Sequence, residues 1–183
     1  MKSIIQQKLF TKNECEYFKS LSNNKIFDRS KVTEYTSLSI VSEYRTSHEV
    51  SIPLNIDLSN SILEKLKEFG IKSLPNYFII LKYDKNQEFK RHNDSGISNS
   101  GVVEYPNRYK TLIIQLSDEF EYKGGELCIF EKDKEIIASK DIGNVIMFDS
   151  PIDHCANKIE EGIRYSMVFW LSIDNFGLNK SLI

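Results

Sequence analysis

The second half of the chain consists of short apolar stretches separated by turn residues, which is the hydrophobic pattern of a β-sheet. These stretches are rich in β-branched and aromatic residues, and turn residues at 124–125, 133–134 and 141–143 punctuate them. No helix-length segment separates the later stretches, so parallel β–α–β winding is not expected. The pattern predicts strands at 76–83, 110–117, 126–131, 134–139, 144–149 and 164–172.

The first half carries the helical signals. Thr11 and Glu14 have the spacing of a capping box, which predicts a helix over about 12–22. A second helix is predicted over about 59–69, and Gly70 suits the left-handed position that follows a helix. Its apolar residues recur at spacings of three and four and are Ile62, Leu63, Leu66 and Phe69.

Helices followed by many closely spaced strands indicate an α+β fold with a β-sandwich or barrel core. Two outer strands, at 34–42 and 47–54, are also expected. No linker rich in proline, glycine or serine divides the chain, so residues 1–183 are predicted to form a single domain. Helical support is expected over about 1–75 and the sheet core over about 76–175.

Composition narrows the classes of function. The chain has 183 residues, 24 Lys and Arg, 26 Asp and Glu, and a formal net charge of −2, which disfavours a dedicated nucleic-acid partner. No apolar run reaches the length of a signal peptide or a membrane span, so a cytoplasmic protein without a membrane partner is expected. Its three cysteines lack zinc-site spacing.

Two of the three histidines occupy positions suited to metal chemistry. His92 and Asp94 are two residues apart just after the predicted strand 76–83, so on an extended segment both side chains face the same way. His154 follows the predicted strand 144–149, where that strand is expected to turn. Two imidazoles and one carboxylate are the ligands of the facial triad of non-haem Fe(II). Taken alone, His92 and Asp94 also fit a surface histidine beside a turn-forming aspartate.

Arg164 opens the strongly apolar predicted strand at 164–172. A guanidinium in this position favours a planar anion such as a carboxylate, which it can bind through two hydrogen bonds. A structural alternative is an ion pair with Asp153, Glu160 or Glu161.

The order of these motifs resembles the prolyl 4-hydroxylase-like branch of the 2-oxoglutarate- and Fe(II)-dependent dioxygenases. The resemblance covers most of the chain and runs through FTKNECEYF, EYRTS, Tyr83, HND at 92–94, KTLIIQLS, GGELCIF, GNVIMF, His154 and GIRYSMVFWL. It implies a double-stranded β-helix, or jelly-roll, core with N-terminal flanking helices, which agrees with the predicted strands.

By this resemblance His92, Asp94 and His154 hold Fe(II), and Arg164 binds the distal carboxylate of the co-substrate 2-oxoglutarate. With O2 as the other co-substrate, 2-oxoglutarate is converted to succinate and CO2 while the substrate is hydroxylated. Whether ascorbate is also used is left open. An arginine at 164, where the secreted collagen-type enzymes usually have lysine, resembles the intracellular and microbial members.

The resemblance also assigns secondary positions. Tyr83 is expected to reach the 2-oxoglutarate pocket, and Gln115 stands where prolyl hydroxylases often have a tyrosine, although its amide can still donate a hydrogen bond. Cofactor-pocket positions are completed by Thr111, Leu127 and Ser166, and substrate contacts are expected from Arg108 and Trp170. For Thr111, Leu127 and Trp170 an ordinary core role is an open alternative.

The expected activity is hydroxylation of a prolyl residue in a peptide or protein. The same chemistry on a free amino acid or another side chain remains an alternative, as does a jelly-roll binding module without catalysis. The irregular segment 92–108 is expected to form a flap over the substrate, and the segment near 27–47 the opposite wall. Oligomeric state is not predicted.

Overall fold

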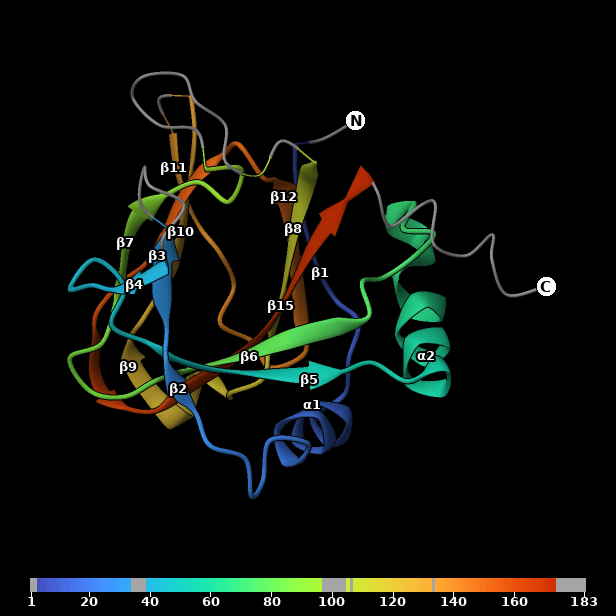
Figure 1. Cartoon of the computed structure of the whole chain (residues 1–183), viewed down its shortest axis with the longest axis horizontal. Coiled ribbons are helices and arrows are strands. Elements are labelled where there is room, and N and C mark those ends of the chain that lie inside the picture. Colours follow the sequence, from blue (N-terminus) through green and yellow to red (C-terminus); the bar gives the residue numbers. More distant parts are fainter. Residues whose placement is uncertain (1–2, 34–38, 97–104, 106, 133, 174–183) are drawn as a thin grey trace.

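Two antiparallel sheets face each other, and two helices cover the outer face of the larger one in the computed structural model (Figure 1). The structure describes residues 3–33, 39–96, 105, 107–132 and 134–173. The helices are α1 (Lys12–Ser20) and α2 (Ile56–Leu66), with 3-10 turns η1 (Lys67–Phe69) and η2 (Glu119–Glu121). The strands are β1 (Ile4–Lys8), β2 (Asp28–Arg29), β3 (Lys31–Thr33), β4 (Ser39–Val41), β5 (His48–Pro53), β6 (Tyr77–Tyr83), β7 (Phe89–His92), β8 (Arg108–Gln115), β9 (Tyr122–Gly124), β10 (Leu127–Glu131), β11 (Lys134–Ile137), β12 (Asn144–Asp149), β13 (Asp153–Ala156), β14 (Ile159–Gly162) and β15 (Arg164–Ser172).

The larger sheet has seven strands in the order β1-β12-β8-β15-β6-β5-β2, and the smaller has four in the order β11-β10-β13-β7. Neighbouring strands are antiparallel throughout both sheets. Two-stranded ribbons, β14-β9 and β3-β4, complete the described part of the fold. This is the predicted α+β jelly roll, because two antiparallel sheets pack face to face with long connections between them.

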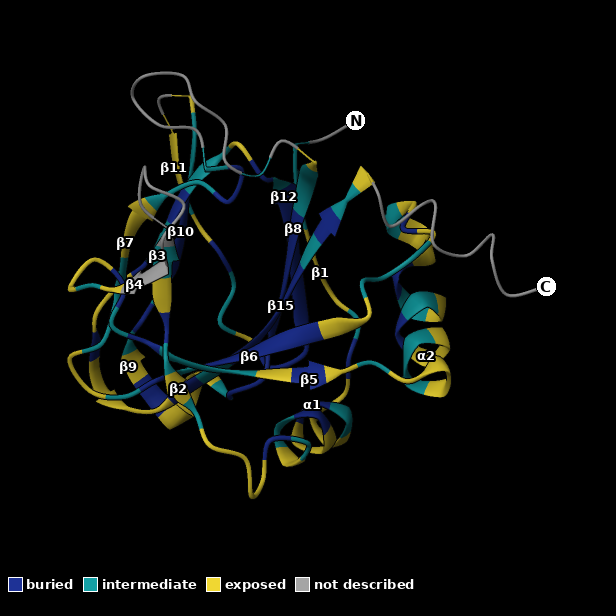
Figure 2. Cartoon of the chain, viewed as in Figure 1, coloured by how far each residue is buried: buried dark blue, intermediate teal, exposed yellow. Residues whose placement is uncertain are grey.

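The central strands of the larger sheet are buried on both faces, as the dark strands of Figure 2 show. Along β6, Phe78 and Ile80 face the helices, whereas Ile79, Leu81 and Tyr83 face the smaller sheet. Side chains of β8 and β15 alternate in the same way between the helices and the smaller sheet, because successive strand side chains point to opposite faces. Near-continuous apolar runs such as 78–81 follow from this double burial.

Both predicted helices are present, and their ends show why they form. The capping box of α1 is confirmed: the Thr11 side chain accepts from the Glu14 N–H, and the Glu14 carboxylate accepts from the Thr11 N–H. Helix α2 begins three residues earlier than predicted because Asn55 caps it, accepting a hydrogen bond from the Leu58 N–H at 2.9 Å. Gly70 has a φ of 74°, the left-handed conformation expected there.

The six strands predicted for the second half are confirmed within a few residues as β6, β8, β10, β11, β12 and β15. Residues 1–75 were expected to provide helical support, and in the structure this region also supplies strands β1 to β5. Strand β1 pairs with β12 through residues 4–8, and the sequence pattern did not reveal it because an edge strand needs few apolar residues. The prediction at 47–54 is confirmed as β5.

Parts of two predictions fall outside the described residues. The expected strand at 34–42 is described only from residue 39, where β4 pairs with β3. Most of the expected flap, residues 97–104 and 106, lies outside the described residues. Among the described helices, none combines the length and apolar character needed to cross a membrane.

Gly143 lies in the turn before β12 and contacts the segment that links β1 to α1. Its carbonyl accepts hydrogen bonds from the N–H groups of Leu9 and Phe10, both at 3.1 Å, and its own N–H donates to the Gln115 carbonyl at 2.9 Å. Its φ is 80°, and a Cβ added here would lie 1.8 Å from the Phe10 carbonyl oxygen. A side chain at this position therefore costs both backbone strain and displacement of the neighbouring chain.

We expect Gly143→Ala to lower the free energy of unfolding by at least about 2 kcal/mol, measured by urea denaturation. Gly70→Ala is the matched control, because Gly70 has a similar φ of 74° but no atom within 4 Å of an added Cβ. That variant should lose only the conformational cost, about 1 kcal/mol. Equal losses in the two variants would contradict the steric contribution assigned to Gly143.

Candidate active site

Two histidines lie side by side on neighbouring strands of the smaller sheet. His92 ends β7 and pairs directly with His154 of β13, and their ring centroids are 4.2 Å apart. The prediction put His154 in a turn directly after β12. The turn is completed by residue 152, and His154 lies within the next strand. Pairing of β13 with β7 therefore fixes the spacing between the two rings.

Asp94 lies two residues beyond His92, and the turn after β12 holds it in place. Its N–H donates to the Ser150 carbonyl at 2.9 Å, and its Oδ2 accepts a hydrogen bond from Thr111 Oγ1 at 2.6 Å. The carboxylate is buried between the sheets, with 8% of the residue exposed. Three segments far apart in the sequence thus meet at one carboxylate.

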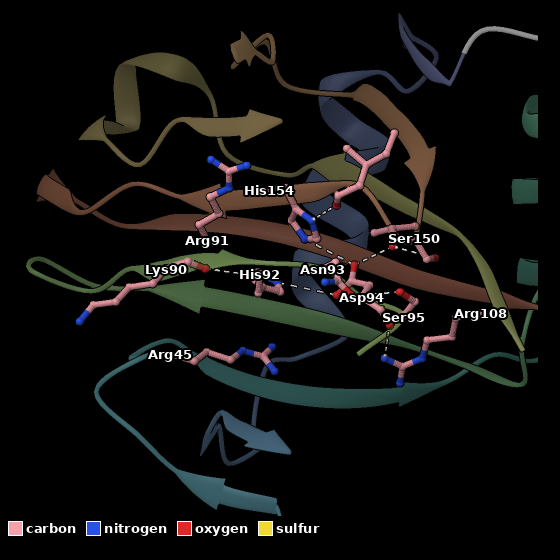
Figure 3. Close-up of polar contacts among 12 residues, drawn as sticks. Arg45, Lys90, Arg91, His92, Asn93, Asp94, Ser95, Arg108, Ser150 and His154 are labelled. Atoms are coloured by element: carbon pink, nitrogen blue, oxygen red, sulfur yellow. Dashed lines mark hydrogen bonds and ion pairs between the residues drawn. The ribbon is translucent and has the colours of Figure 1, made fainter. Parts of the chain in front are cut away.

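The ring nitrogens of both histidines point toward this carboxylate (Figure 3). His92 Nε2 is 3.7 Å from Asp94 Oδ1, and His154 Nε2 is 3.4 Å from Asp94 Oδ2. The other nitrogen of each ring faces a backbone carbonyl, with Nδ1 2.7 Å from the Lys90 oxygen in His92 and 3.1 Å from the Ile152 oxygen in His154. In the neutral rings Nδ1 therefore carries the hydrogen, and the Nε2 lone pairs face carboxylate oxygens.

Electrostatics favour a neutral His92 ring and an ionised Asp94 carboxylate. Burial, reinforced by the neighbouring His154, lowers the pKa of His92 from 6.5 to about 3, so this ring is neutral at physiological pH. Burial alone would raise the pKa of Asp94, but the two imidazoles and the Thr111 hydrogen bond outweigh it and hold that pKa below its ordinary value. An ionised carboxylate facing two ring lone pairs is a donor set that a cation between them would satisfy, and the three ligand atoms lie within 4.8 Å of one another.

A cavity between the sheets surrounds this cluster. It is lined by Arg45, Leu81, Tyr83, Phe89, His92, Asp94, Thr111, Ile113, Leu127, His154, Ala156, Arg164, Ser166, Val168 and Trp170. The walls are mainly apolar, and the polar groups converge on a few points, which is typical of a ligand site. Of the residues predicted for the site, all except Arg108 and Gln115 line the cavity.

Strand register explains why these side chains meet. Residues 164, 166, 168 and 170 of β15 share the inner face of the larger sheet because they are two apart. Across the sheet Arg164 pairs with Tyr83, Ser166 with Gln115, and Trp170 with Thr111. Gln115 does not line the cavity, but its Oε1 accepts a hydrogen bond from Arg164 Nη2 at 3.0 Å.

Arg164 is 2% exposed. Among the described residues it forms no ion pair, so the predicted alternative partners Asp153, Glu160 and Glu161 are not used. Nη2 of Arg164 donates a hydrogen bond to Gln115, whereas Nε of Arg164 has no partner among the described residues. A buried guanidinium without a counter-ion is costly, so this end of the cavity suits an anionic ligand.

Arg108 and Trp170 lie together on the side of the cluster near Asp94. The Arg108 guanidinium carbon is 4.4 Å from the centroid of the Trp170 ring and 3.9 Å from that of Tyr105. Arg108 Nη1 also donates to the Asp94 carbonyl at 3.3 Å (Figure 3). Both predicted substrate-contact residues are therefore adjacent to Asp94.

Arg45 lines the cavity but was not among the predicted site residues. It is 6% exposed, forms an ion pair with Glu49 at 2.9 Å, and lies over the Phe89 ring at 4.8 Å. The sequence signal was EYRTS at 43–47, which carried the resemblance without a role being assigned to its arginine. Only the pairing of Arg45 with Phe89 of β7 brings this segment to the cavity.

The fold and this donor set are those of the jelly-roll non-haem iron oxygenases. A sequence model of the 2OG-Fe(II) oxygenase superfamily matches residues 78–172, and the chain belongs to this family. It is thus a 2-oxoglutarate-dependent dioxygenase that uses Fe(II) and 2-oxoglutarate.

Individual relatives agree with this family. A PKHD-type hydroxylase from Prochlorococcus marinus is 26% identical over 153 residues, covering 81% of this chain and 67% of the relative. Among solved structures, a prolyl-4-hydroxylase from Pseudomonas putida has a TM-score of 0.67 and 16% identity, covering 93% of this chain and 92% of the other. A prolyl hydroxylase from Trichoplax adhaerens, solved with a hypoxia-inducible-factor peptide, has a TM-score of 0.68 and 13% identity, covering 98% and 88%. At these identities the structures show the shared fold.

We expect the metal-free protein to lose stability as the pH falls from 6.5 toward 3. His92 binds a proton near pH 6.5 when unfolded but only near pH 3 when folded, so acid favours the unfolded state. This group alone contributes at most about 1.4 kcal/mol per pH unit, and His92→Gln should flatten the slope in urea titrations. The His92 ring signals in NMR, assigned with the same variant, should not titrate between about pH 5 and 8; a midpoint near 6.5 would contradict the assignment.

Proposed function

We propose that this dioxygenase hydroxylates a prolyl residue in a peptide or protein, with its iron held by His92, Asp94 and His154. The observation that carries the metal assignment is the convergence of two imidazole lone pairs on one buried, ionised carboxylate. Iron bound there supplies the oxidising chemistry that couples conversion of 2-oxoglutarate to succinate and CO2 with hydroxylation of the substrate. Three protein ligands leave positions open for the co-substrates.

The protein's own contribution at the metal is to orient the ligands. Backbone carbonyls of Lys90 and Ile152 fix the ring tautomers, and the Thr111 hydroxyl holds one carboxylate oxygen. Such contacts behind the ligands commonly change metal affinity by about 10- to 100-fold when removed. In this proposal Thr111 supports Asp94.

The other end of the cavity is proposed to bind 2-oxoglutarate. Arg164 provides the counter-charge for the distal carboxylate, and Gln115 holds the guanidinium in place. Tyr83, Leu127 and Ser166 line the same cavity as Arg164 and the histidines. In this proposal a dicarboxylate places one end at Arg164 and the other at the iron.

Arg108 and Trp170 are proposed to contact the substrate. Trp170 is partly exposed beside Asp94 and offers an aromatic surface against which a proline ring can pack. The named activities of the similar prolyl hydroxylases support a prolyl substrate. A cytoplasmic location and the lack of a nucleic-acid partner stay predictions.

We expect Fe(II) and 2-oxoglutarate, added together without oxygen, to give the weak visible absorption band of a 2-oxo acid bound to Fe(II). His92→Ala should abolish the band because one of three ligands is lost, whereas His48→Ala should keep it. His48 is the matched control because its Nδ1 contacts Gln87 and it does not line the cavity. A band that survives unchanged in His92→Ala would refute the metal assignment.

We expect proline-containing peptides incubated with Fe(II), 2-oxoglutarate, O2 and the enzyme to gain 16 Da, detected by mass spectrometry. Fragmentation should place the added oxygen on proline. Trp170→Ala should reduce kcat/KM for the peptide by at least about tenfold while leaving iron binding intact. Modification of a different side chain, or of free amino acids alone, would replace the prolyl proposal with one of its alternatives.

A further inference from the structure

Tyr122 carries a buried hydroxyl beside the Arg164 guanidinium, and no described residue accepts the hydrogen of this hydroxyl. The residue begins β9, is 4% exposed, and packs in the core between the two sheets. Its Oη is among the few buried side-chain atoms without a partner in the described residues. Buried phenols usually find a partner, so an isolated one inside a ligand-binding fold indicates a missing ligand.

The side chain lies against Arg164, whose Nε is also without a partner in the same part of the chain. A Cβ built on Gly125 would be 3.3 Å from Tyr122 Cε2 and 3.4 Å from Arg164 Cδ, so one glycine backs onto both side chains. The Lys140 ammonium lies over the tyrosine ring at 4.2 Å from its centroid. These contacts hold the ring in a fixed position beside the guanidinium.

The hydroxyl is a donor under physiological conditions. Burial raises the pKa of Tyr122, and the neighbouring Arg164 only partly opposes this effect. The phenol is therefore protonated near neutral pH and has one hydrogen to give. A carboxylate has two oxygens and about four lone-pair sites, so it can accept from a guanidinium and a phenol together.

We propose that Tyr122 donates its hydroxyl hydrogen to the distal carboxylate of 2-oxoglutarate, beside the guanidinium of Arg164. The inference rests on the proposed role of Arg164 and adds Tyr122 to Gln115 as a side chain beside that guanidinium. Like Gln115, Tyr122 does not line the described cavity, so the carboxylate would meet it at the inner end, next to Arg164. Tyr122 selects for a second carboxylate on the co-substrate.

The test is calorimetric titration of the Mn(II)-loaded protein with two ligands, 2-oxoglutarate and 2-oxopentanoate. They have the same carbon chain, but the second lacks the distal carboxylate. Loss of a hydrogen bond to a charged group should raise the Kd of Tyr122→Phe for 2-oxoglutarate by about tenfold or more. Its Kd for 2-oxopentanoate should not change. Because no described residue accepts the hydrogen of this hydroxyl, the variant should unfold at the wild-type temperature.

Tyr165→Phe is the matched control. It removes a hydroxyl one residue from Arg164, from a side chain that packs on the opposite face of β15 with the helix-side core. Both of its Kd values should stay within about twofold of wild type. A Tyr122→Phe Kd for 2-oxoglutarate within twofold of wild type, or equal weakening of both ligands, would overturn the inference.

Arg164→Lys separates direct donation from an indirect effect. If Tyr122 contacts the carboxylate, removing its hydroxyl in the Arg164→Lys background should again weaken 2-oxoglutarate binding about tenfold. No further loss in the double variant would show that Tyr122 acts only through the guanidinium and would overturn direct donation. If the proposed pocket itself were wrong, the wild-type protein would bind 2-oxoglutarate and 2-oxopentanoate with equal Kd values.

Discussion

The whole architecture depends on burying both faces of the larger sheet. One face of β6, β8 and β15 packs against α1 and α2, and the other faces the smaller sheet. Because strand side chains alternate, one set of positions builds the apolar layer under the helices and the other set lines the cavity. Catalytic and supporting side chains can therefore occupy the inner positions without weakening the helix-side core.

On the face of the larger sheet that lines the cavity, polar residues occupy only a few positions in otherwise apolar strands. Thr111, Gln115, Arg164 and Ser166 are each at most 2% exposed, in strands whose other inner residues are mainly aliphatic. Buried polar groups are costly unless they are satisfied. Thr111 is satisfied by Asp94, whereas the Nε of Arg164 has no partner among the described residues. This difference separates a side chain that supports another residue from one suited to bind a ligand.

The smaller sheet sets the spacing between the rings of His92 and His154. Pairing of β7 with β13 sets His92 opposite His154, and the turn after β12 brings the Ser150 carbonyl to the Asp94 N–H. Rigid strands position metal ligands more reproducibly than loops, since each backbone hydrogen bond restrains its neighbours. The apolar walls of the cavity keep His92 neutral and so available as a ligand.

The sequence by itself determined the local and periodic features. The capping box of α1, the strands of the second half and the paired spacing of His92 and Asp94 all follow from short-range chemistry. Motif order added Arg164 and His154. Only the tertiary structure decided that Arg45 lines the cavity, that Thr111 supports Asp94 and that Tyr122 lies against Arg164. These relations join distant segments through sheet register and packing, which a local sequence pattern does not specify for strands far apart in the chain.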